Sequence, residues 1–324
     1  MKVHVSRDFP KPGIDLLIEH GIETNLWKED RPQTQEELNE NVKDHDALFC
    51  ASTDKIDAHF LKESAHLKII SQFAVGYDNI DLTEATRQGI LVTNTPDVMR
   101  NATADIAFIL MLAASRKIIW MHKKIIRGQW DYFRPRADLG RELMDATLGI
   151  FGMGRIGMEM AKRCKAAYNM NILYTDQNNN EFAEKMYGAK KVSLDELCAQ
   201  SDVVSVHCPL TDETRGLFNL SVFKKMKPTS IFVNSARGPV HNEPELITAL
   251  KEGIIWGAGL DVMETEPTSK DNPLAEMENV ALVPHIGSAT IQARDAMSRL
   301  AGENILDYIN GRKVKNILNP DVLK

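Results

Sequence analysis

Residues 148–157 read LGIFGMGRIG, and this stretch decides the fold. Its apolar first half predicts a buried strand, and its glycines allow a sharp turn that leaves backbone N–H groups bare at the start of a helix. Good helix formers follow at 158–167, and a second apolar run at 170–175 ends at Asp176, about twenty residues beyond the turn. A carboxylate at that point can accept hydrogen bonds from an adenosine ribose. The stretch therefore predicts a dinucleotide-binding βαβ unit.

A glycine pattern of this kind is weak evidence when it stands alone, because a Gly-rich turn between a strand and a helix can also bind nothing. Here a strand precedes the turn, a helix follows it, and an acidic residue ends the next strand. All three features of the expected context are present. They favour a cofactor site over an ordinary turn.

The composition is that of an ordinary globular protein. The chain has 324 residues, of which 43% are hydrophobic and 26% charged, and this length favours two domains over one core. The net charge is −6, and no tract of Lys or Arg occurs. These values argue against a nucleic-acid partner and against an anionic membrane surface, although a local basic pocket for a small anion stays open.

The first residues and the cysteines predict a cytoplasmic protein. Residues 1–6 alternate like a strand, without the apolar core of a signal peptide, and no apolar run approaches the length of a membrane span. The four cysteines, Cys50, Cys164, Cys198 and Cys208, lie far apart and without zinc-like spacing. We therefore expect reduced, mostly buried thiols and no metal site.

Strand-like and helix-like segments alternate along nearly the whole chain, which is typical of a parallel α/β architecture. In the first part of the chain, TQEE at 34–37 is a capping box for a helix that we expect to reach about residue 44. The other expected elements there are strands at 3–6, 47–51, 67–73 and 90–93, and a helix from Pro12 to Gly21. Together these segments predict a small α/β unit.

The middle and last parts of the chain continue this alternation. A long apolar helix is expected at 102–118 and continues over 119–127; we expect its body to be core between domains or subunits rather than a cofactor site. The helical pattern at 291–309 has no local strand to pair with, so we expect it to return to the first domain. Between them lie an irregular stretch at 129–145 and further expected strands at 203–207, 230–234, 255–261 and 280–283.

Three segments that could carry chemistry follow predicted strands in the last third of the chain, and open α/β sheets bind ligands at such strand ends. The segment NSARG at 234–238 contains an arginine whose planar fork suits a carboxylate. The segment GLDVMETEP at 259–267 is acidic, and VPHIGS at 283–288 places a histidine between a strand and a helix. Taken singly, they are also explained as a surface charge, a solvated loop and a structural histidine. The sequence alone does not show that they converge.

These segments, the glycine turn and AVGYDNID at 74–81 resemble the D-isomer-specific 2-hydroxyacid dehydrogenases over nearly the whole chain. The similarity is greatest to the glyoxylate and hydroxypyruvate reductase branch, on YDNID at 77–81 and TNTPDV at 93–98. Five ordered blocks at the family's spacing are far more specific than any one motif.

The resemblance implies an α/β fold of two Rossmann-like domains with parallel sheets. A flavodoxin-like substrate domain would comprise residues 1–100 and 289–324, and an NAD-binding Rossmann domain would comprise residues 101–288. The resemblance also implies a homodimer, built largely around the nucleotide domain and the helices at 101–127.

The family pattern further implies roles for individual residues. Arg237 would hold the substrate carboxylate and polarise the reacting carbonyl, and backbone N–H groups of Val75 and Gly76 would complete the carboxylate cradle. His285 would be the general acid in reduction and the general base in oxidation. Glu266 would hydrogen-bond the imidazole, fix its orientation and favour its protonated form. The implied reaction is the reduction of a small 2-keto acid, such as glyoxylate or hydroxypyruvate, to the 2-hydroxy acid.

The implied cofactor is NAD(H). The pyrophosphate would lie on Gly154, Arg155 and Ile156, and the ribose on Asp176. Because QNNN at 177–180 contains no Arg or Lys to neutralise a 2′-phosphate, we expect NAD(H) to be preferred over NADP(H). The other implied cofactor-site residues are Thr103, Gly152, Met153, Gly157, Pro209, Thr214, Ser235, Ala236, Arg237, Asp261, His285 and Gly287. His207 and Cys208 flank this strip, and we interpret both as wall residues rather than reactants.

Alternative functions remain open within and beyond this family. Phosphoglycerate, phosphite, formate and D-lactate-type dehydrogenases share the fold and the arginine, so the fold alone does not choose among them. Formate dehydrogenases pair their histidine with an amide, and Glu266 argues against that branch. The C-terminal-binding-protein corepressors keep the fold and use nicotinamide binding to assemble partners, but the long terminal extensions expected of such a scaffold are missing. A non-catalytic NAD-sensing protein is therefore the less favoured alternative.

Overall fold

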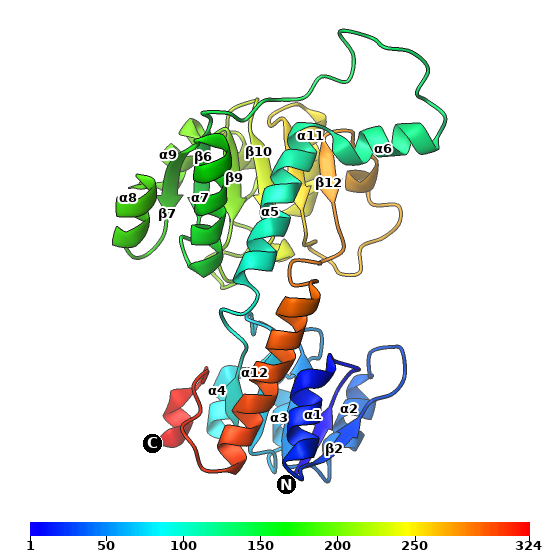
Figure 1. Cartoon of the computed structure of the whole chain (residues 1–324), viewed down its shortest axis with the longest axis vertical. Helices are drawn as coiled ribbons and strands as arrows, with labels where there is room; N and C mark the ends of the chain where they lie inside the picture. The colour runs from blue at the N-terminus through cyan, green and yellow to red at the C-terminus, as the bar shows by residue number, and fades with distance from the viewer. The chain divides into compact units, whose positions relative to one another are not determined.

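The computed structural model describes residues 1–324 and shows two compact units (Figure 1). The first unit comprises Met1–Met99 and Ser288–Lys324, and the second comprises Arg100–Gly287. Each unit contains one sheet, and every pair of neighbouring strands is parallel. The predicted α/β class with two parallel sheets is confirmed.

The sheet of the first unit has the strand order β2-β1-β3-β4-β5, which is the flavodoxin-like order. Within β3, Phe49 packs into one apolar cluster and its neighbours Leu48 and Cys50 into another, because successive side chains of a strand point to opposite faces. The edge strand β2 was not predicted from the sequence, because its segment ETNL is polar and only partly buried. The five strands are β1 (Lys2–Val5), β2 (Glu23–Leu26), β3 (Ala47–Ala51), β4 (Ile69–Phe73) and β5 (Leu91–Thr93).

Four of the five α-helices of the first unit begin at a residue whose side chain caps them. The predicted capping box at Thr34 and Glu37 is present, and Asp57 and Asp81 cap α3 and α4 through their carboxylates. The helices are α1 (Lys11–Glu19), α2 (Gln35–Val42), α3 (Ala58–Glu63), α4 (Leu82–Arg87) and α12 (Ile291–Ile309), followed by the short 3₁₀ helix η3 (Pro320–Leu323).

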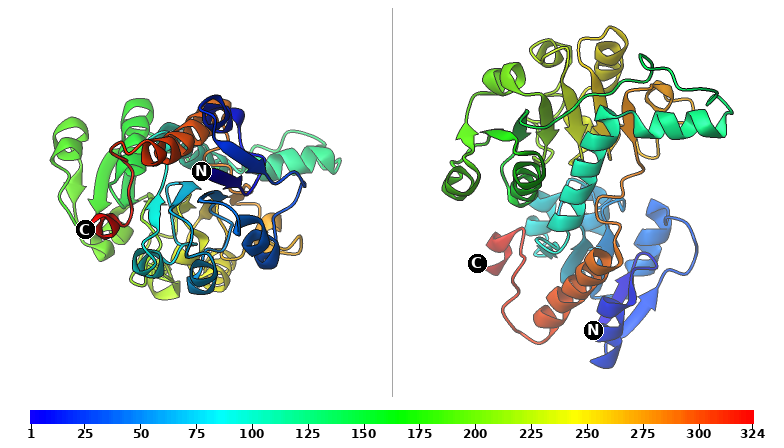
Figure 2. Two further views of the ribbon diagram at one scale, coloured as in Figure 1. Left: turned by 90° about the horizontal axis from the view of Figure 1, so that it is seen from below. Right: turned by 45° about the horizontal axis from the view of Figure 1, so that its top comes forward.

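Helix α12, from the end of the chain, packs beside α1, from its beginning (Figures 1 and 2). The Gly13 N–H donates to the Ser298 hydroxyl at 3.1 Å, and that hydroxyl donates to the Pro10 carbonyl. A Cβ at Gly13 would collide with the Ser298 backbone, so a glycine is required for this close approach. On the sheet side, the Ser71 hydroxyl donates to the Ala301 carbonyl at 2.9 Å. The chain thus returns to its first unit after leaving the second.

The sheet of the second unit has the strand order β12-β11-β10-β9-β6-β7-β8. The order reverses beside β6: β7 and β8 extend the sheet on one side, and β9 to β12 extend it on the other. Such a reversal opens a crevice at the carboxyl ends of the two strands that flank it, here β6 and β9. The seven strands are β6 (Thr147–Phe151), β7 (Asn171–Thr175), β8 (Lys190–Lys191), β9 (Val203–Val206), β10 (Ile231–Asn234), β11 (Gly257–Leu260) and β12 (Val280–Leu282).

Helices cover both faces of this sheet, as a buried parallel sheet requires (Figure 1). Along β10, Ile231 and Val233 pack with α5 and α7, whereas Phe232 packs with α9, α10 and α11 on the opposite face. The helices are α5 (Arg100–Ser115), α7 (Arg155–Tyr168), α8 (Glu181–Tyr187), α9 (Leu194–Gln200), α10 (Leu220–Phe223) and α11 (Glu243–Lys251), with the short 3₁₀ helices η1 (Gly238–Val240) and η2 (Pro273–Glu276).

The predicted helix over 102–127 is divided at Lys117, whose φ of 54° places it in the left-handed region. Helix α6 (Ile118–Ile126) therefore leaves in a new direction, and the irregular segment 128–142 follows it (Figure 1). Helix α6 buries none of its residues in the chain. No helix of the chain combines the length and the apolar character needed to cross a bilayer.

Candidate active site

The glycine turn after β6 has the geometry of a nucleotide-binding turn. Gly152 has φ 95°, and a Cβ there would lie 2.8 Å from the His207 carbonyl carbon. Gly154 caps α7, and a Cβ on it would point into open space, where a ligand can approach the backbone. At Gly157, a Cβ would collide with the Gly152 carbonyl and lie 3.0 Å from Ile150 Cγ2, so glycine lets α7 pack closely on β6. Gly152 thus permits the sharp turn, Gly154 leaves room for a ligand to approach the backbone, and Gly157 lets the helix pack on the strand.

Asp176 lies directly after β7, beside this turn. Its Oδ2 accepts the Met153 N–H at 2.8 Å, and its Oδ1 accepts the Asn178 N–H at 3.2 Å. The Asn180 side chain donates to the Met153 carbonyl at 2.9 Å. The carboxylate predicted to meet a ribose is therefore held against the glycine turn by the loop that follows it.

The residues of this edge fit a dinucleotide. The first turn of α7 presents N–H groups with the positive end of the helix dipole, which suits a pyrophosphate. The Ser235 hydroxyl, at the end of β10, is buried and has no hydrogen-bond partner within the chain. A buried hydroxyl without a partner is costly, so a bound group that pairs with it would be stabilised. The other predicted residues of the turn differ in exposure: Met153 is buried, Ile156 is half-buried, and Arg155 is exposed at the start of α7.

His285 and Glu266 form a hydrogen-bonded pair at the carboxyl edge of the same sheet. Nδ1 of His285 lies 2.7 Å from Glu266 Oε2, and both side chains are partly exposed, at 43% and 35%. The other carboxylate oxygen accepts the Met263 N–H at 2.9 Å, which fixes the plane of the carboxylate. With Nδ1 engaged in this way, Nε2 is the nitrogen that can meet a reacting group.

The Glu266 carboxylate is held in its charged form. Burial by itself would raise the pKa of Glu266, but the hydrogen bonds from His285 and from the Met263 N–H, with the charges of His285 and Arg237, lower it below its ordinary value. Glu266 is therefore ionised at neutral pH, and it places a negative charge 2.7 Å from Nδ1 of His285.

The backbone of His285 adopts an unusual conformation that a buried carboxylate supports. Its φ of 50° lies in the left-handed region, which costs free energy for a residue other than glycine. Asp261, at the end of β11, accepts the Ile286 N–H at 2.6 Å and the Gly287 N–H at 2.9 Å, and its carbonyl accepts the His285 N–H at 2.8 Å. Burial raises the pKa of Asp261, although these N–H donors oppose the rise. Asp261, expected as a cofactor-lining residue, thus holds the histidine loop in place.

Arg237 follows β10 in a turn that Asn234 builds. The Asn234 side chain accepts the Ala236 N–H at 3.0 Å and donates to the Arg237 carbonyl at 2.8 Å, while the Arg237 guanidinium donates to the Ala236 carbonyl at 2.8 Å. A Cβ at Gly238 would collide with the Met263 carbonyl, so this turn is pressed against the loop that leads to Glu266. No role for Asn234 was predicted from the segment NSARG, although an amide ending the apolar run IFVN was a usable signal.

The structure thus brings together the three segments whose convergence the sequence left open. Arg237, Glu266 and His285 follow β10, β11 and β12, which are neighbours in the sheet. Thr103 of α5 joins the same edge, because its hydroxyl donates to the Gly287 carbonyl at 3.3 Å. The Thr214 hydroxyl, beyond β9, donates to the Pro209 carbonyl at 2.8 Å and so shapes the loop predicted to line the cofactor site.

Val75 and Gly76 belong to the first unit and follow β4. Their carbonyls accept side-chain amides: Asn94 donates to the Val75 carbonyl at 2.8 Å, and Gln72 donates to the Gly76 carbonyl at 2.6 Å. Both donors are buried, so they fix the loop from beneath; Asn94 belongs to the block TNTPDV at 93–98, whereas no motif indicated Gln72.

His207 and Cys208, which directly follow β9, are both held in uncharged forms. Burial lowers the pKa of His207 to about 4, so its imidazole is neutral at pH 7, and Nε2 lies 2.8 Å from the Ser205 hydroxyl. Burial raises the pKa of Cys208 to about 12, so its thiol is protonated. All four cysteines are buried and free, as expected.

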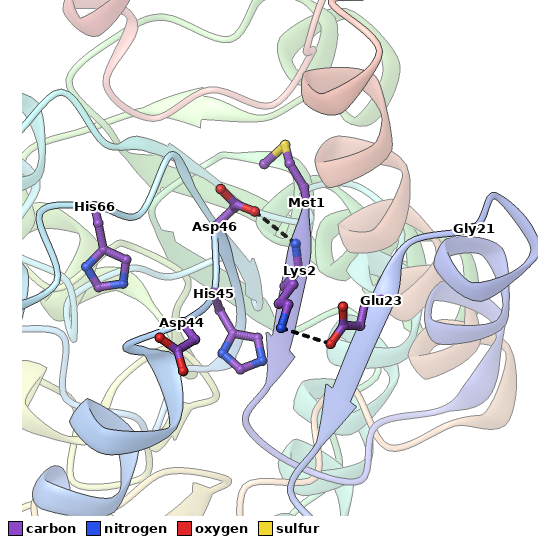
Figure 3. A pocket seen from close by; sticks show the side chains of 8 residues that line it. All are labelled: Met1, Lys2, Gly21, Glu23, Asp44, His45, Asp46 and His66. Atoms are coloured by element: carbon purple, nitrogen blue, oxygen red, sulfur yellow. Dashed lines mark hydrogen bonds and ion pairs between the residues drawn. The ribbon is translucent and has the colours of Figure 1, made fainter.

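A hollow of about 540 Å³ also opens at the amino edge of the first unit's sheet (Figure 3). Lys2 and Glu23, which begin β1 and β2, form an ion pair of 3.1 Å there, and the Lys2 N–H donates to Asp46 at 2.9 Å. Ligands of open parallel sheets bind at the opposite, carboxyl edge, and none of the predicted site residues lines this hollow. Its lining residues are Met1, Lys2, Gly21, Glu23, Asp44, His45, Asp46 and His66.

Comparisons with known proteins agree with this geometry. Residues 108–287 match the model of the D-isomer specific 2-hydroxyacid dehydrogenase NAD binding domain. The glyoxylate reductase of Korarchaeum cryptofilum is 43% identical over 324 residues, which is 100% of this chain and 97% of the relative. That of Pyrococcus furiosus is 45% identical over 327 residues, which is 100% of this chain and 96% of the relative.

Solved structures show the same likeness. A glyoxylate reductase from Paecilomyes thermophila superposes with a TM-score of 0.87 at 32% identity, covering 98% of each chain. The NADPH-dependent glyoxylate/hydroxypyruvate reductase of Sinorhizobium meliloti, in complex with NADP and malonate, has a TM-score of 0.84 at 28% identity and covers 98% of this chain and 96% of its own. Fold and site together define a dinucleotide-dependent oxidoreductase. The chain belongs to the D-isomer specific 2-hydroxyacid dehydrogenase family, as its motifs predicted.

Proposed function

We propose that this chain is an NAD(H)-dependent reductase that converts a small 2-keto acid, such as glyoxylate or hydroxypyruvate, to the 2-hydroxy acid. The observation that carries the proposal is the 2.7 Å contact between His285 and Glu266, beside Arg237 on a dinucleotide-binding sheet. The full-length relatives named above are glyoxylate reductases.

Arg237 is the residue we propose for substrate binding. Its planar guanidinium can hold a carboxylate through two parallel hydrogen bonds and can polarise the neighbouring carbonyl. Its turn is fixed by the buried Asn234 side chain, so the fork is oriented before substrate arrives. We give the backbone N–H groups of Val75 and Gly76 a supporting role in carboxylate binding.

His285 is the proposed proton donor. The nicotinamide, when bound, supplies the hydride that reaches the carbonyl carbon. As the carbonyl oxygen gains negative charge, the imidazolium gives it the proton held on Nε2, and the resulting neutral ring keeps its Nδ1 proton on the Glu266 side. In the reverse reaction, the neutral ring takes that proton back.

For the cofactor, we propose the residues of the carboxyl edge described above. The turn from Gly152 to Gly157 would bind the pyrophosphate, Asp176 the ribose, and Ser235 would use the hydroxyl that has no partner in the chain. The other proposed residues are Thr103, Pro209, Thr214, Ala236, Arg237, Asp261, His285 and Gly287. We assign residues 1–100 and 289–324 to a substrate-binding domain and residues 101–288 to an NAD-binding domain.

We also propose that the protein is a cytoplasmic homodimer. Helix α6 and the segment after it expose large apolar side chains, among them Ile126 at 71%, Trp130 at 76% and Phe133 at 85%. Exposed apolar side chains gathered on one projecting segment are typical of protein–protein interfaces. A second copy of this chain is the proposed occupant. The four free thiols suit a reducing compartment.

The first prediction concerns the substrate. Glyoxylate or hydroxypyruvate should be reduced with NADH at a kcat/KM about tenfold or more above that of phenylpyruvate, because the full-length relatives named above are glyoxylate reductases. Pyruvate should still be reduced, although more slowly than glyoxylate, since its additional methyl group changes binding by only about 1–3 kcal/mol. Competition of the four acids at equal concentration measures this order. A higher kcat/KM for phenylpyruvate would move the protein to the D-lactate-type branch.

The second prediction concerns the cofactor. Asp176 should repel a 2′-phosphate, so kcat/KM with NADH should exceed that with NADPH by tenfold or more, which is about 1.4 kcal/mol. Cofactor use differs within the family, since the Sinorhizobium relative is NADPH-dependent. Replacing Asp176 with alanine should narrow the gap. Equal kcat/KM values for the two cofactors in the wild type would contradict the prediction.

The third prediction concerns the acid–base pair. Glu266→Gln keeps the shape of the side chain but replaces the carboxylate 2.7 Å from His285 Nδ1 with a neutral amide, so the imidazolium that donates the proton loses its ionic partner and kcat for reduction should fall about tenfold or more. His285→Ala should lower kcat by about 10²-fold or more, the usual scale of positioned acid–base catalysis. A Glu266→Gln variant that is folded and keeps the wild-type kcat would remove Glu266 from the mechanism.

The fourth prediction concerns the dimer. Analytical ultracentrifugation should show a wild-type dimer at micromolar concentration and a monomer for Phe133→Glu, because a charge in an apolar interface is costly. Phe182→Glu is the matched control, since Phe182 is an exposed phenylalanine, at 55%, on α8. A monomeric wild type, or equal dissociation by both variants, would overturn the proposed interface.

A further inference from the structure

A lysine from a neighbouring strand lies against the loop that follows Asp176. Lys191 ends β8, and its ammonium donates to the Gln177 carbonyl at 3.1 Å and to Asn179 Oδ1 at 3.1 Å. Lys191 stands outside QNNN at 177–180, where the sequence showed no cation. The residues that directly follow Asp176 therefore show only part of the charge around this loop, because the sheet brings Lys191 to it.

The position of Lys191 is set by the sheet. Strand β8 pairs with β7 so that Lys191 stands opposite Tyr174, two residues before Asp176. The Thr175 hydroxyl donates to the Val192 carbonyl at 2.9 Å, which holds the two strand ends together. The sheet thus fixes the backbone position of Lys191, while its exposed side chain can rotate toward a ligand.

The loop that Lys191 contacts is itself joined to the nucleotide turn. Asp176 accepts the Met153 N–H, and Asn180 donates to the Met153 carbonyl. A ribose held by Asp176 would place its 2′ substituent beside this loop. An ammonium has three donors, and the two hydrogen bonds to the loop leave one for a phosphate oxygen.

We propose that Lys191 is a specificity-determining residue of the nucleotide site: it attracts the 2′-phosphate of NADP(H) and offsets part of the repulsion by Asp176. This inference rests on the proposed function and refines its cofactor preference. The chain then prefers NAD(H) but retains measurable affinity for NADP(H). The opposing charges of Asp176 and Lys191 set the ratio between the two.

The test compares two nucleotide fragments that differ only in the 2′-phosphate. Isothermal titration calorimetry gives the Kd of 5′-AMP and the Kd of a matched 2′-phosphorylated fragment, 2′,5′-ADP, for the full chain. We measure the wild type, Lys191→Gln and the control Lys190→Gln. Lys190 carries the same charge on the same strand and is also exposed, but successive strand residues point to opposite faces.

In Lys191→Gln, the affinity for 2′,5′-ADP relative to 5′-AMP should fall about fivefold, the scale of one partly exposed ion pair. Lys190→Gln should keep the wild-type ratio. Raising the ionic strength from about 0.05 M to 0.5 M should shrink the difference between wild type and Lys191→Gln, since salt screens exposed charges.

Three results would overturn the inference: an unchanged ratio in Lys191→Gln, an equal loss for both fragments, or the same change of ratio in Lys190→Gln. The equal loss would mean that Lys191 only supports the loop. Failure of the proposed function has a different signature, because the wild type would then bind neither fragment and would not oxidise NADH with glyoxylate. A wild type that binds 5′-AMP and oxidises NADH, with no effect of Lys191→Gln on the ratio, refutes this inference alone.

Discussion

A parallel sheet is stable in water only when helices cover both of its faces, and this constraint organises both units. Each strand must return through a crossover to the same end of the sheet, so the carboxyl ends of all strands meet at one edge. In the second unit that edge collects the glycine turn, Asp176, Arg237, Glu266 and His285. The position of the proposed site thus follows from the burial of the strands. The residues that follow each strand supply its chemistry.

The residues that we propose to act at this edge depend on buried polar groups that fix the backbone around them. The Asp261 carboxylate accepts hydrogen bonds from N–H groups of the histidine loop, and the Asn234 side chain closes the turn that carries Arg237. Both are buried at strand ends, where an unpaired polar group would be costly and a fully paired one fixes a single geometry. The left-handed backbone of His285 is maintained in this way. Buried hydrogen bonds thus orient the histidine and the arginine.

The proposed adenosine end of the site illustrates how charge is distributed by topology. Asp176 belongs to the strand–turn–helix–strand motif and could be recognised by its spacing. Lys191 comes from a two-residue edge strand that no pattern indicated, and only its pairing with β7 brings the ammonium to the loop after Asp176. A charge carried by a neighbouring strand can therefore modify what a motif predicts about a ligand.

The sequence by itself determined the fold class and the motifs. Apolar periodicity located the buried strands, the capping box at 34–37 located a helix start, and the glycine spacing after β6 located the turn into α7, because these signals are local and report burial or backbone geometry directly. Only the tertiary structure decided the convergence of Arg237 and Glu266 with the histidine, the support from Asn234, and the place of Lys191. Those contacts join residues from different strands, and their partners are fixed by strand order and register, which no local pattern encodes.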